Sequence, residues 1–201
     1  MTKIFAHRGA SAYAPENTME AFELAAKQGA DGIELDVHVT KDGEVVVTHD
    51  EKIDRVSNGS GFIKDMTLRE LKRLSFHNHM ESYVGAGIPT LREVLEYVST
   101  TNMDVNIELK TGIYWYPQIE EKTAFIVQET GMHDRVIYSS FNHHSIAKIK
   151  EIDSTAETAW LFSDVILNVE QYAKANGVEG LHPAVYHMYI CLLYTSDAAD
   201  D

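Results

Sequence analysis

Acidic side chains alternate with apolar ones in the segment 32–39, whose sequence is Gly-Ile-Glu-Leu-Asp-Val-His-Val. Successive side chains of a β-strand point to opposite faces, so a strand here places Glu34, Asp36 and His38 on one face. Both faces of a central parallel strand are normally buried, and buried ionisable groups need a partner such as a cation. The alternative is an edge strand whose acidic face lies in water.

The segment 106–110, Asn-Ile-Glu-Leu-Lys, has the same alternation and places Glu108 and Lys110 on one face. Carboxylates of Glu34, Asp36 and Glu108 would give a hard cation three oxygen ligands and leave positions for water and phosphate, which suits Mg²⁺ or Ca²⁺. A structural zinc site is disfavoured because no cysteine lies nearby. The alternative for Glu108 and Lys110 is a structural ion pair.

Two histidines follow apolar runs that are typical of strands. His7 is followed by Arg8, and His49 follows the run 45–48. Active sites of α/β barrels gather at the carboxyl ends of strands, and imidazole titrates near neutral pH. One histidine can therefore activate a nucleophile while the other protonates a leaving alkoxide. Each histidine taken alone is more often structural.

Phosphate oxygens are natural partners for the cations beside these groups. Arg8 offers a bidentate fork and Lys110 a point charge, although each can instead pair with the same carboxylates. Four other histidines are expected at the surface, namely His77, His79, His143 and His144.

Short β-type runs alternate with amphipathic stretches of helical length, which indicates an α/β fold built from βα units around a parallel sheet. The predicted strands of this sheet are 3–7, 32–39, 104–110, 135–139, 155–162 and 178–182.

The first helix has a start and a stop signal. Asn17 is predicted to cap it, with Glu20 completing a capping box, and Gly29 is predicted to end it. The segment 50–89 breaks the alternation and is interpreted as an insertion on one βα loop, because such long loops usually carry function.

Within that insertion only the segment 67–74 has a helical pattern. Thr90 is then predicted to cap a helix over 91–98.

Composition limits the class of protein. A chain of 201 residues fits one domain, and its net charge of -14 repels nucleic acid and anionic lipid surfaces. Cys191 is the single cysteine, so no intrachain disulfide can form. The apolar run before His7 is too short for a signal peptide, so a cytoplasmic location and no stable membrane insertion are expected.

Five motifs together resemble the glycerophosphodiester phosphodiesterase family in their order and spacing, from about residue 3 to about residue 187. They are Ala-His-Arg-Gly at 6–9, Pro-Glu-Asn-Thr at 15–18, Glu-Leu-Asp-Val-His-Val-Thr-Lys-Asp-Gly at 34–43, Thr-His-Asp at 48–50 and Glu-Leu-Lys at 108–110.

The resemblance implies a TIM-barrel-like (β/α) barrel with an insertion after the second strand, and metal-dependent hydrolysis of small glycerophosphodiesters to glycerol 3-phosphate and an alcohol. Carried over by motif, the roles are an acid-base pair of His7 and His49, metal ligands Glu34, Asp36 and Glu108, phosphate contacts Arg8 and Lys110, and residues at the site mouth, Glu16 and Asn17. Phe141, in Ser-Ser-Phe, resembles a position near the substrate pocket.

The end of the chain departs from this pattern. Six of the eight strands that a complete barrel needs are recognisable, and the segment 188–201 matches nothing expected of the family. We expect a partial barrel over 1–187 with open sheet edges, followed by an unrelated tail.

Two other functions remain open at this point. One is phospholipase C- or D-like chemistry on intact lipids, and the other is a catalytically inactive fragment that binds metal or phosphate. The sequence indicates no oligomeric state and no preferred alcohol head group.

Overall fold

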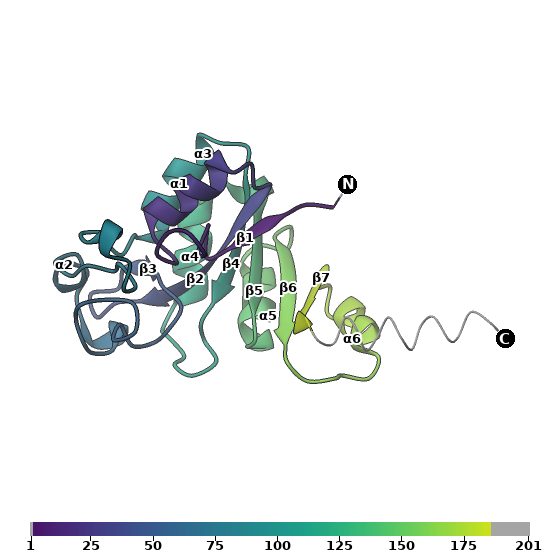
Figure 1. Ribbon diagram of the computed structural model, residues 1–201. Helices are drawn as coiled ribbons and strands as arrows, with labels where there is room; N and C mark the ends of the chain where they lie inside the picture. Colours follow the sequence, from purple (N-terminus) through teal and green to yellow (C-terminus); the bar gives the residue numbers. More distant parts are fainter. Residues whose placement is uncertain (1, 186–201) are drawn as a thin grey trace.

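A computed structural model describes residues 2–185 of the chain, and a curved, mostly parallel sheet forms its centre (Figure 1). Six strands are parallel and lie in the order β1-β2-β4-β5-β6-β7. They are β1 (Phe5–His7), β2 (Gly32–Val39), β4 (Asp104–Leu109), β5 (Val136–Ser140), β6 (Glu157–Phe162) and β7 (Gly180–Pro183). A seventh strand, β3 (Val45–Val47), pairs with β2 in antiparallel fashion.

Helices follow most of the parallel strands and cover one side of the sheet, so that the whole curls into an open half-barrel (Figure 1). The helices are α1 (Met19–Lys27), α2 (Leu68–Leu71), α3 (Leu91–Ser99), α4 (Ile119–Glu129), α5 (His143–Ile152) and α6 (Val169–Ala175). The predicted α/β class is confirmed, and each predicted strand matches an observed one within two residues at either end.

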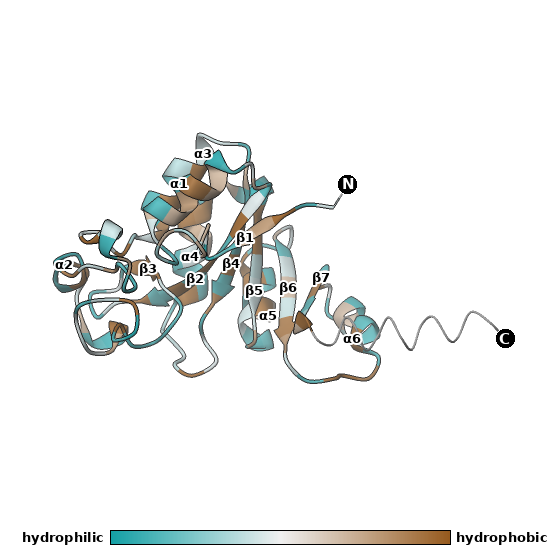
Figure 2. Ribbon diagram, in the orientation of Figure 1, coloured by the Kyte–Doolittle hydropathy of each residue, from teal (hydrophilic) through white to brown (hydrophobic). Residues whose placement is uncertain are grey.

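The alternation along β2 separates the core from the site. Ile33, Leu35 and Val37 are fully buried in the main core between sheet and helices. Burial of each such side chain contributes roughly 1.5–3 kcal/mol. Figure 2 shows apolar segments on the central strands and on α1, and mostly hydrophilic loops at the carboxyl ends of the strands, the lower edge in this view. The acidic face of β2 therefore points away from a well-packed helix layer.

The cap of α1 differs from the prediction. Thr18, not Asn17, is the N-cap residue, with an extended backbone and a side chain that accepts a hydrogen bond from the Ala21 amide at 3.4 Å. Asn17 has a left-handed backbone, with φ of 57°, and its side chain turns into the site instead. The predicted stop is confirmed, because Gly29 has φ of +79° just beyond the end of α1.

The insertion lies between the second and third parallel strands, after β3, as the resemblance implies. It has a small core of its own, which is made of Val46, Ile53, Val56, Ile63, Leu71, Phe76 and Ile88. The helix predicted over 67–74 is shorter, Leu68–Leu71, and Thr67 and Thr90 each form a capping box, before α2 and α3 respectively.

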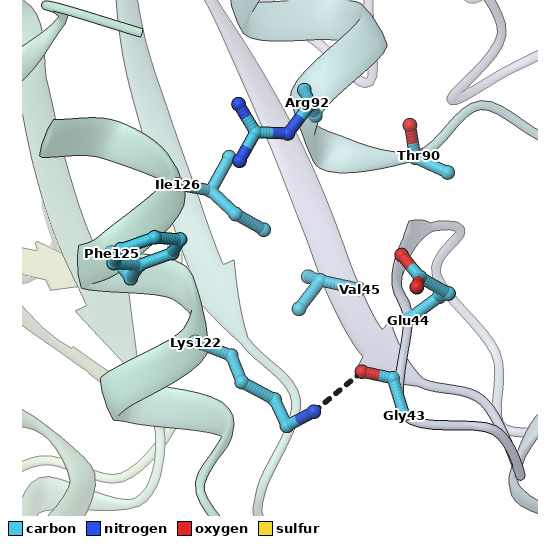
Figure 3. A pocket seen from close by; sticks show the side chains of 8 residues that line it. All are labelled: Gly43, Glu44, Val45, Thr90, Arg92, Lys122, Phe125 and Ile126. Carbon is cyan, nitrogen blue, oxygen red and sulfur yellow. Dashed lines mark hydrogen bonds between the residues drawn. The ribbon is translucent and has the colours of Figure 1, made fainter. Parts of the chain in front are cut away.

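The hairpin of β2 and β3 is tied to the helix layer. The Lys122 amine on α4 donates a hydrogen bond to the Gly43 carbonyl at 2.6 Å, across a groove of about 240 Å³ (Figure 3). The aliphatic and aromatic floor of this groove comes from Val45, Phe125 and Ile126. None of the site residues predicted from the sequence lines it.

The histidines predicted at the surface divide into two groups. His79 and His144 are exposed and His77 is half-buried. His143 is half-buried as well, and its ring stacks on Trp160 with centroids 4.3 Å apart.

The predicted boundary at 187, the predicted tail 188–201 and Cys191 lie outside the described residues. Within residues 2–185, no helix has the length and apolar character that crossing a membrane requires.

Candidate active site

Three carboxylates converge at the carboxyl ends of two neighbouring strands. Glu34 and Asp36 lie on β2, Glu108 lies on β4, and the parallel register places Asp36 beside Glu108. One oxygen of each carboxylate lies within 4.8 Å of the others, with Asp36 and Glu108 buried and Glu34 half-buried. The structure thus brings together the three predicted metal ligands.

Crowding of these carboxylates opposes their ionisation. Burial raises the pKa of Glu34 to about 8, and the charges of Asp36 and Glu108 add to the effect. Burial and Asp36 likewise raise the pKa of Glu108, against the effect of Lys110. The carboxylates of the cluster therefore need more positive charge nearby than the protein supplies if all of them are to be ionised at neutral pH.

The donor set fits a divalent cation. The Oδ1 atom of Asp36 is buried and has no hydrogen-bond partner among the described residues. Lys110 supplies part of the missing charge, because its Nζ lies 2.9 Å from Glu108 and 3.6 Å from Asp36. Three carboxylates, one of which has an oxygen that accepts no hydrogen bond, suit a hard, oxygen-preferring ion.

The end of β1 and the turn that follows it bring His7 and Arg8 to the edge of this cluster. The Nε2 atom of His7 lies 3.8 Å from a Glu34 oxygen, and the side chain is 71% exposed. Partial desolvation at the mouth of the site and the positive charge of Arg8 lower the pKa of His7. The imidazole therefore takes up a proton less readily than a free histidine, and it faces solvent.

Arg8 is held by carboxylates on both sides. Its Nη1 donates to Glu16 at 3.1 Å, and its Nε lies 3.7 Å from Asp36. Its backbone is left-handed, with φ of 58°, and its amide donates to the Glu34 backbone and side chain, both at 3.0 Å. These contacts fix the turn that follows His7.

His49 has its side chain oriented by the next residue. Its Nδ1 donates to the Asp50 carboxylate at 2.6 Å, which leaves Nε2 as the nitrogen available for proton transfer. Arg55, together with His49, lowers the pKa of Asp50 to about 2, so this carboxylate is ionised at any working pH. The pair resembles the base and its orienting group of other hydrolytic sites.

Arg55, in the insertion, links the segment that carries His49 to the loop that follows His7. Its guanidinium donates to Asp50 at 2.7 Å and forms two bonds with Glu16 at 2.8 and 2.9 Å. Glu16 in turn binds Arg8. The pKa of Glu16 is lowered because these arginine contacts outweigh the opposing effect of burial. The network joins the β1–α1 loop to the insertion.

Two further residues predicted for the site, Asn17 and Phe141, differ in their contact with the carboxylate cluster. The Asn17 side-chain amide donates to Asp36 at 2.9 Å, so this residue holds the cluster in place. Phe141 follows β5 with 51% of its surface exposed, and the hydrogen bonds and ion pairs that join the cluster in residues 2–185 do not include it.

Sequence reasoning placed His38 on the polar face of its strand without a role, and it missed Asp50, Arg55 and Tyr116, the last of which hydrogen-bonds His38 at 2.9 Å. The adjacency of His49 and Asp50 was a usable signal, because a carboxylate next to a histidine can fix its tautomer. Arg55 lies in a segment without periodicity, and Tyr116 lies in a loop. No spacing pattern pointed to either.

Residues 7–193 match the glycerophosphoryl diester phosphodiesterase family. The chain belongs to this family. The glycerophosphodiester phosphodiesterase of Bacillus altitudinis is 48% identical over 187 residues, which are 92% of this chain and 76% of that protein. The enzyme of that name from Caldanaerobacter subterraneus subsp. tengcongensis is 44% identical over 188 residues, 93% of this chain and 77% of its own length.

Solved structures of the family have the same fold. An Oleispira antarctica phosphodiesterase, in complex with the product sn-glycerol-3-phosphate, superposes with a TM-score of 0.86 at 29% identity. The match covers 91% of this chain and 75% of that one. Membership of the glycerophosphodiester phosphodiesterase family thus agrees with the TIM-barrel-like half-barrel described above.

Proposed function

We propose that this chain hydrolyses small glycerophosphodiesters to glycerol 3-phosphate and an alcohol, with a divalent cation as cofactor. The observation that carries this proposal is the convergence of three carboxylates, two of them buried, with two histidines at one end of the sheet. Membership of the family and the glycerol 3-phosphate bound by the Oleispira antarctica relative support the same substrate class.

Glu34, Asp36 and Glu108 are the proposed ligands, and Mg²⁺ or Ca²⁺ is the proposed ion because both prefer oxygen donors. A cation bound there neutralises phosphate charge and polarises the phosphoryl oxygen. Asn17 keeps Asp36 oriented by donating to Oδ2, so that Oδ1 accepts no hydrogen bond and has only the Lys110 amine nearby, at 3.6 Å.

His7 and His49 are the proposed acid-base pair. His49 presents Nε2 because Asp50 holds Nδ1, and His7, at the end of β1, lies beside Glu34. One imidazole enters neutral and takes the proton of the attacking hydroxyl, and the other enters as imidazolium and gives its proton to the departing alkoxide. The attacking group is water, or a neighbouring glycerol hydroxyl that gives a cyclic phosphate, and trapping such a cyclic product separates the two routes.

Arg8 and Lys110 are the proposed phosphate contacts. Both already lie beside carboxylates, Arg8 at Glu16 and Lys110 at Glu108. An incoming phosphate would replace these carboxylates as a partner of each cation. Glu16 shapes the mouth through its bonds to two arginines. Phe141 near the substrate pocket, a domain over 1–187 and a cytoplasmic location stay predictions.

Replacement of one histidine tests the proposal. His7→Ala should abolish turnover of glycerophosphocholine while the affinity for Mg²⁺ or Ca²⁺, measured by calorimetry, stays within about twofold, because the imidazole is no ligand in this scheme. His144→Ala is the matched control, since His144 is exposed and outside the network. Metal binding without turnover by the unaltered chain would favour the inactive metal-binding alternative instead.

A further inference from the structure

His38 continues the polar face of β2 beyond Asp36, yet its partners are not the carboxylates. The side chain is fully buried, with Nε2 at 3.0 Å from the His49 carbonyl oxygen and Nδ1 at 2.9 Å from the Tyr116 hydroxyl. The rings of His38 and Tyr116 meet edge to face, at 5.5 Å and 83°. One buried imidazole therefore joins β2, the segment just after β3 and the loop before α4.

The direction of each hydrogen bond follows from the groups involved. A backbone carbonyl can only accept, so Nε2 of His38 carries the proton and donates to His49. Nδ1 then has a lone pair and accepts the proton of the Tyr116 hydroxyl, which is 5% exposed at the residue level. The two hydrogen bonds thus determine the tautomer of His38 and the orientation of the Tyr116 hydroxyl.

His49 lies just past the end of β3, where the strand ladder no longer constrains it. The last ladder-like bond runs from the Thr48 amide to the Asp36 carbonyl at 3.0 Å. Beyond it, Asp50 holds the imidazole of His49 and His38 holds its carbonyl. The side chain and the backbone of one residue are thus fixed from two directions.

We propose that His38 and Tyr116 are positioning residues for His49, acting through its backbone carbonyl to keep Nε2 aimed at the substrate. This inference rests on the proposed function of His49. A buried histidine that merely fills the core would be replaceable by an apolar side chain of similar size without loss of turnover per folded molecule. A positioning role requires the hydrogen-bond donor, because small misplacements of a reacting group are costly.

The variants follow from that requirement. His38→Leu removes the donor and should lower kcat by about 10–100-fold with little change in KM, as is typical when a residue that orients a functional side chain is removed. His38→Gln keeps an N–H donor of similar reach and should retain most of the wild-type kcat. Tyr116→Phe should give a smaller loss, and should cost almost nothing more in the His38→Leu background, because it acts through His38.

Stability needs a separate measurement. Melting temperatures of all variants are compared with that of Ile149→Val, a change at a fully buried core position on α5 that is far along the chain from the network. Kinetics are measured at a temperature where every variant is folded by circular dichroism, and affinity for Mg²⁺ should be unchanged throughout. Nitrogen NMR of the imidazoles in the full chain should show His38 as the Nε2–H tautomer.

The possible results are distinct. Unchanged kcat in His38→Leu, a full additional loss from Tyr116→Phe in that background, or an Nδ1–H tautomer of His38 overturns this inference while leaving the proposed function intact. Absence of turnover by the wild-type chain with metal present would overturn the proposed function and this inference together. Rescue by His38→Gln with an unchanged KM supports it.

Discussion

Removal of divalent metal should make the stability of this chain fall as pH rises from 6.5 to 8. The reason is Glu34, whose pKa is raised to about 8 in the folded protein by burial and by its carboxylate neighbours. In the unfolded chain the same carboxyl ionises near pH 4.5. Across this window folding therefore takes up a proton, and stability declines as protons become scarcer.

The size of the effect follows from the width of the window. Each pH unit changes the free energy of unfolding by about 1.4 kcal/mol per proton well below the folded pKa, and because Glu34 is half ionised at pH 8, the decline from pH 6.5 to 8 is about 1.6 kcal/mol. Glu108, whose pKa is also raised, acts in the same direction. Below pH 6.5 the decline is masked by His38. Burial lowers the pKa of this histidine to about 4, so its own contribution to stability rises with pH there and offsets the contribution of Glu34.

Urea unfolding of chelator-treated protein at pH 6.5 and pH 8 measures this difference. Glu34→Gln is the matched variant, since it keeps the shape and removes the titration, and its stability should change much less between the two pH values. Saturating Mg²⁺ or Ca²⁺ should abolish the decline in the wild type, because the cation stabilises the ionised cluster. Stability that rises with pH in the metal-free wild type, or an equal decline in Glu34→Gln, would refute the electrostatic reasoning.

Two further predictions concern the loops around the site. Gly9→Ala should lower the melting temperature and cost about 1–3 kcal/mol of stability, because Gly9 has φ of +79° and a Cβ there would lie 2.8 Å from Ala21. Gly87→Ala is the control, because a Cβ at that position meets no atom within 4 Å. Equal losses of stability in the two variants would contradict the predicted clash. Arg55→Met should lower kcat roughly tenfold, because Asp50 loses the guanidinium that holds it. Steady-state kinetics of the folded variant measure this effect. An unchanged kcat would show that His49 is oriented without Arg55.

The main strands could be predicted from the sequence because the period of two along 32–39 and 106–110 is strong. The same alternation placed the three carboxylates on neighbouring strands, and parallel pairing with Asp36 beside Glu108 brought them together. Capping was harder at α1, where Asn17 and Thr18 are both good cap residues. The structure gives the cap to Thr18 because Asn17 turns toward Asp36.

Residues that act through long-range contacts could not be found in this way. Arg55 reaches Glu16 across 39 positions of sequence, and Tyr116 reaches His38 across 78. Both lie outside regular strands and helices, where no periodicity indicates which way a side chain points. The packing of the insertion and of the β4–α4 loop decides these contacts, and only the folded structure displays that packing.

The most direct test of the proposed function is identification of the products by phosphorus NMR when the wild-type chain is incubated with glycerophosphocholine. With Mg²⁺ or Ca²⁺ the predicted phosphorus-containing product is glycerol 3-phosphate, and with excess chelator no product should form. Asp36→Asn, which removes charge at the centre of the cluster, should behave as the chelated wild type does. Release of phosphocholine in place of glycerol 3-phosphate, or the same turnover with and without chelator, would contradict the account.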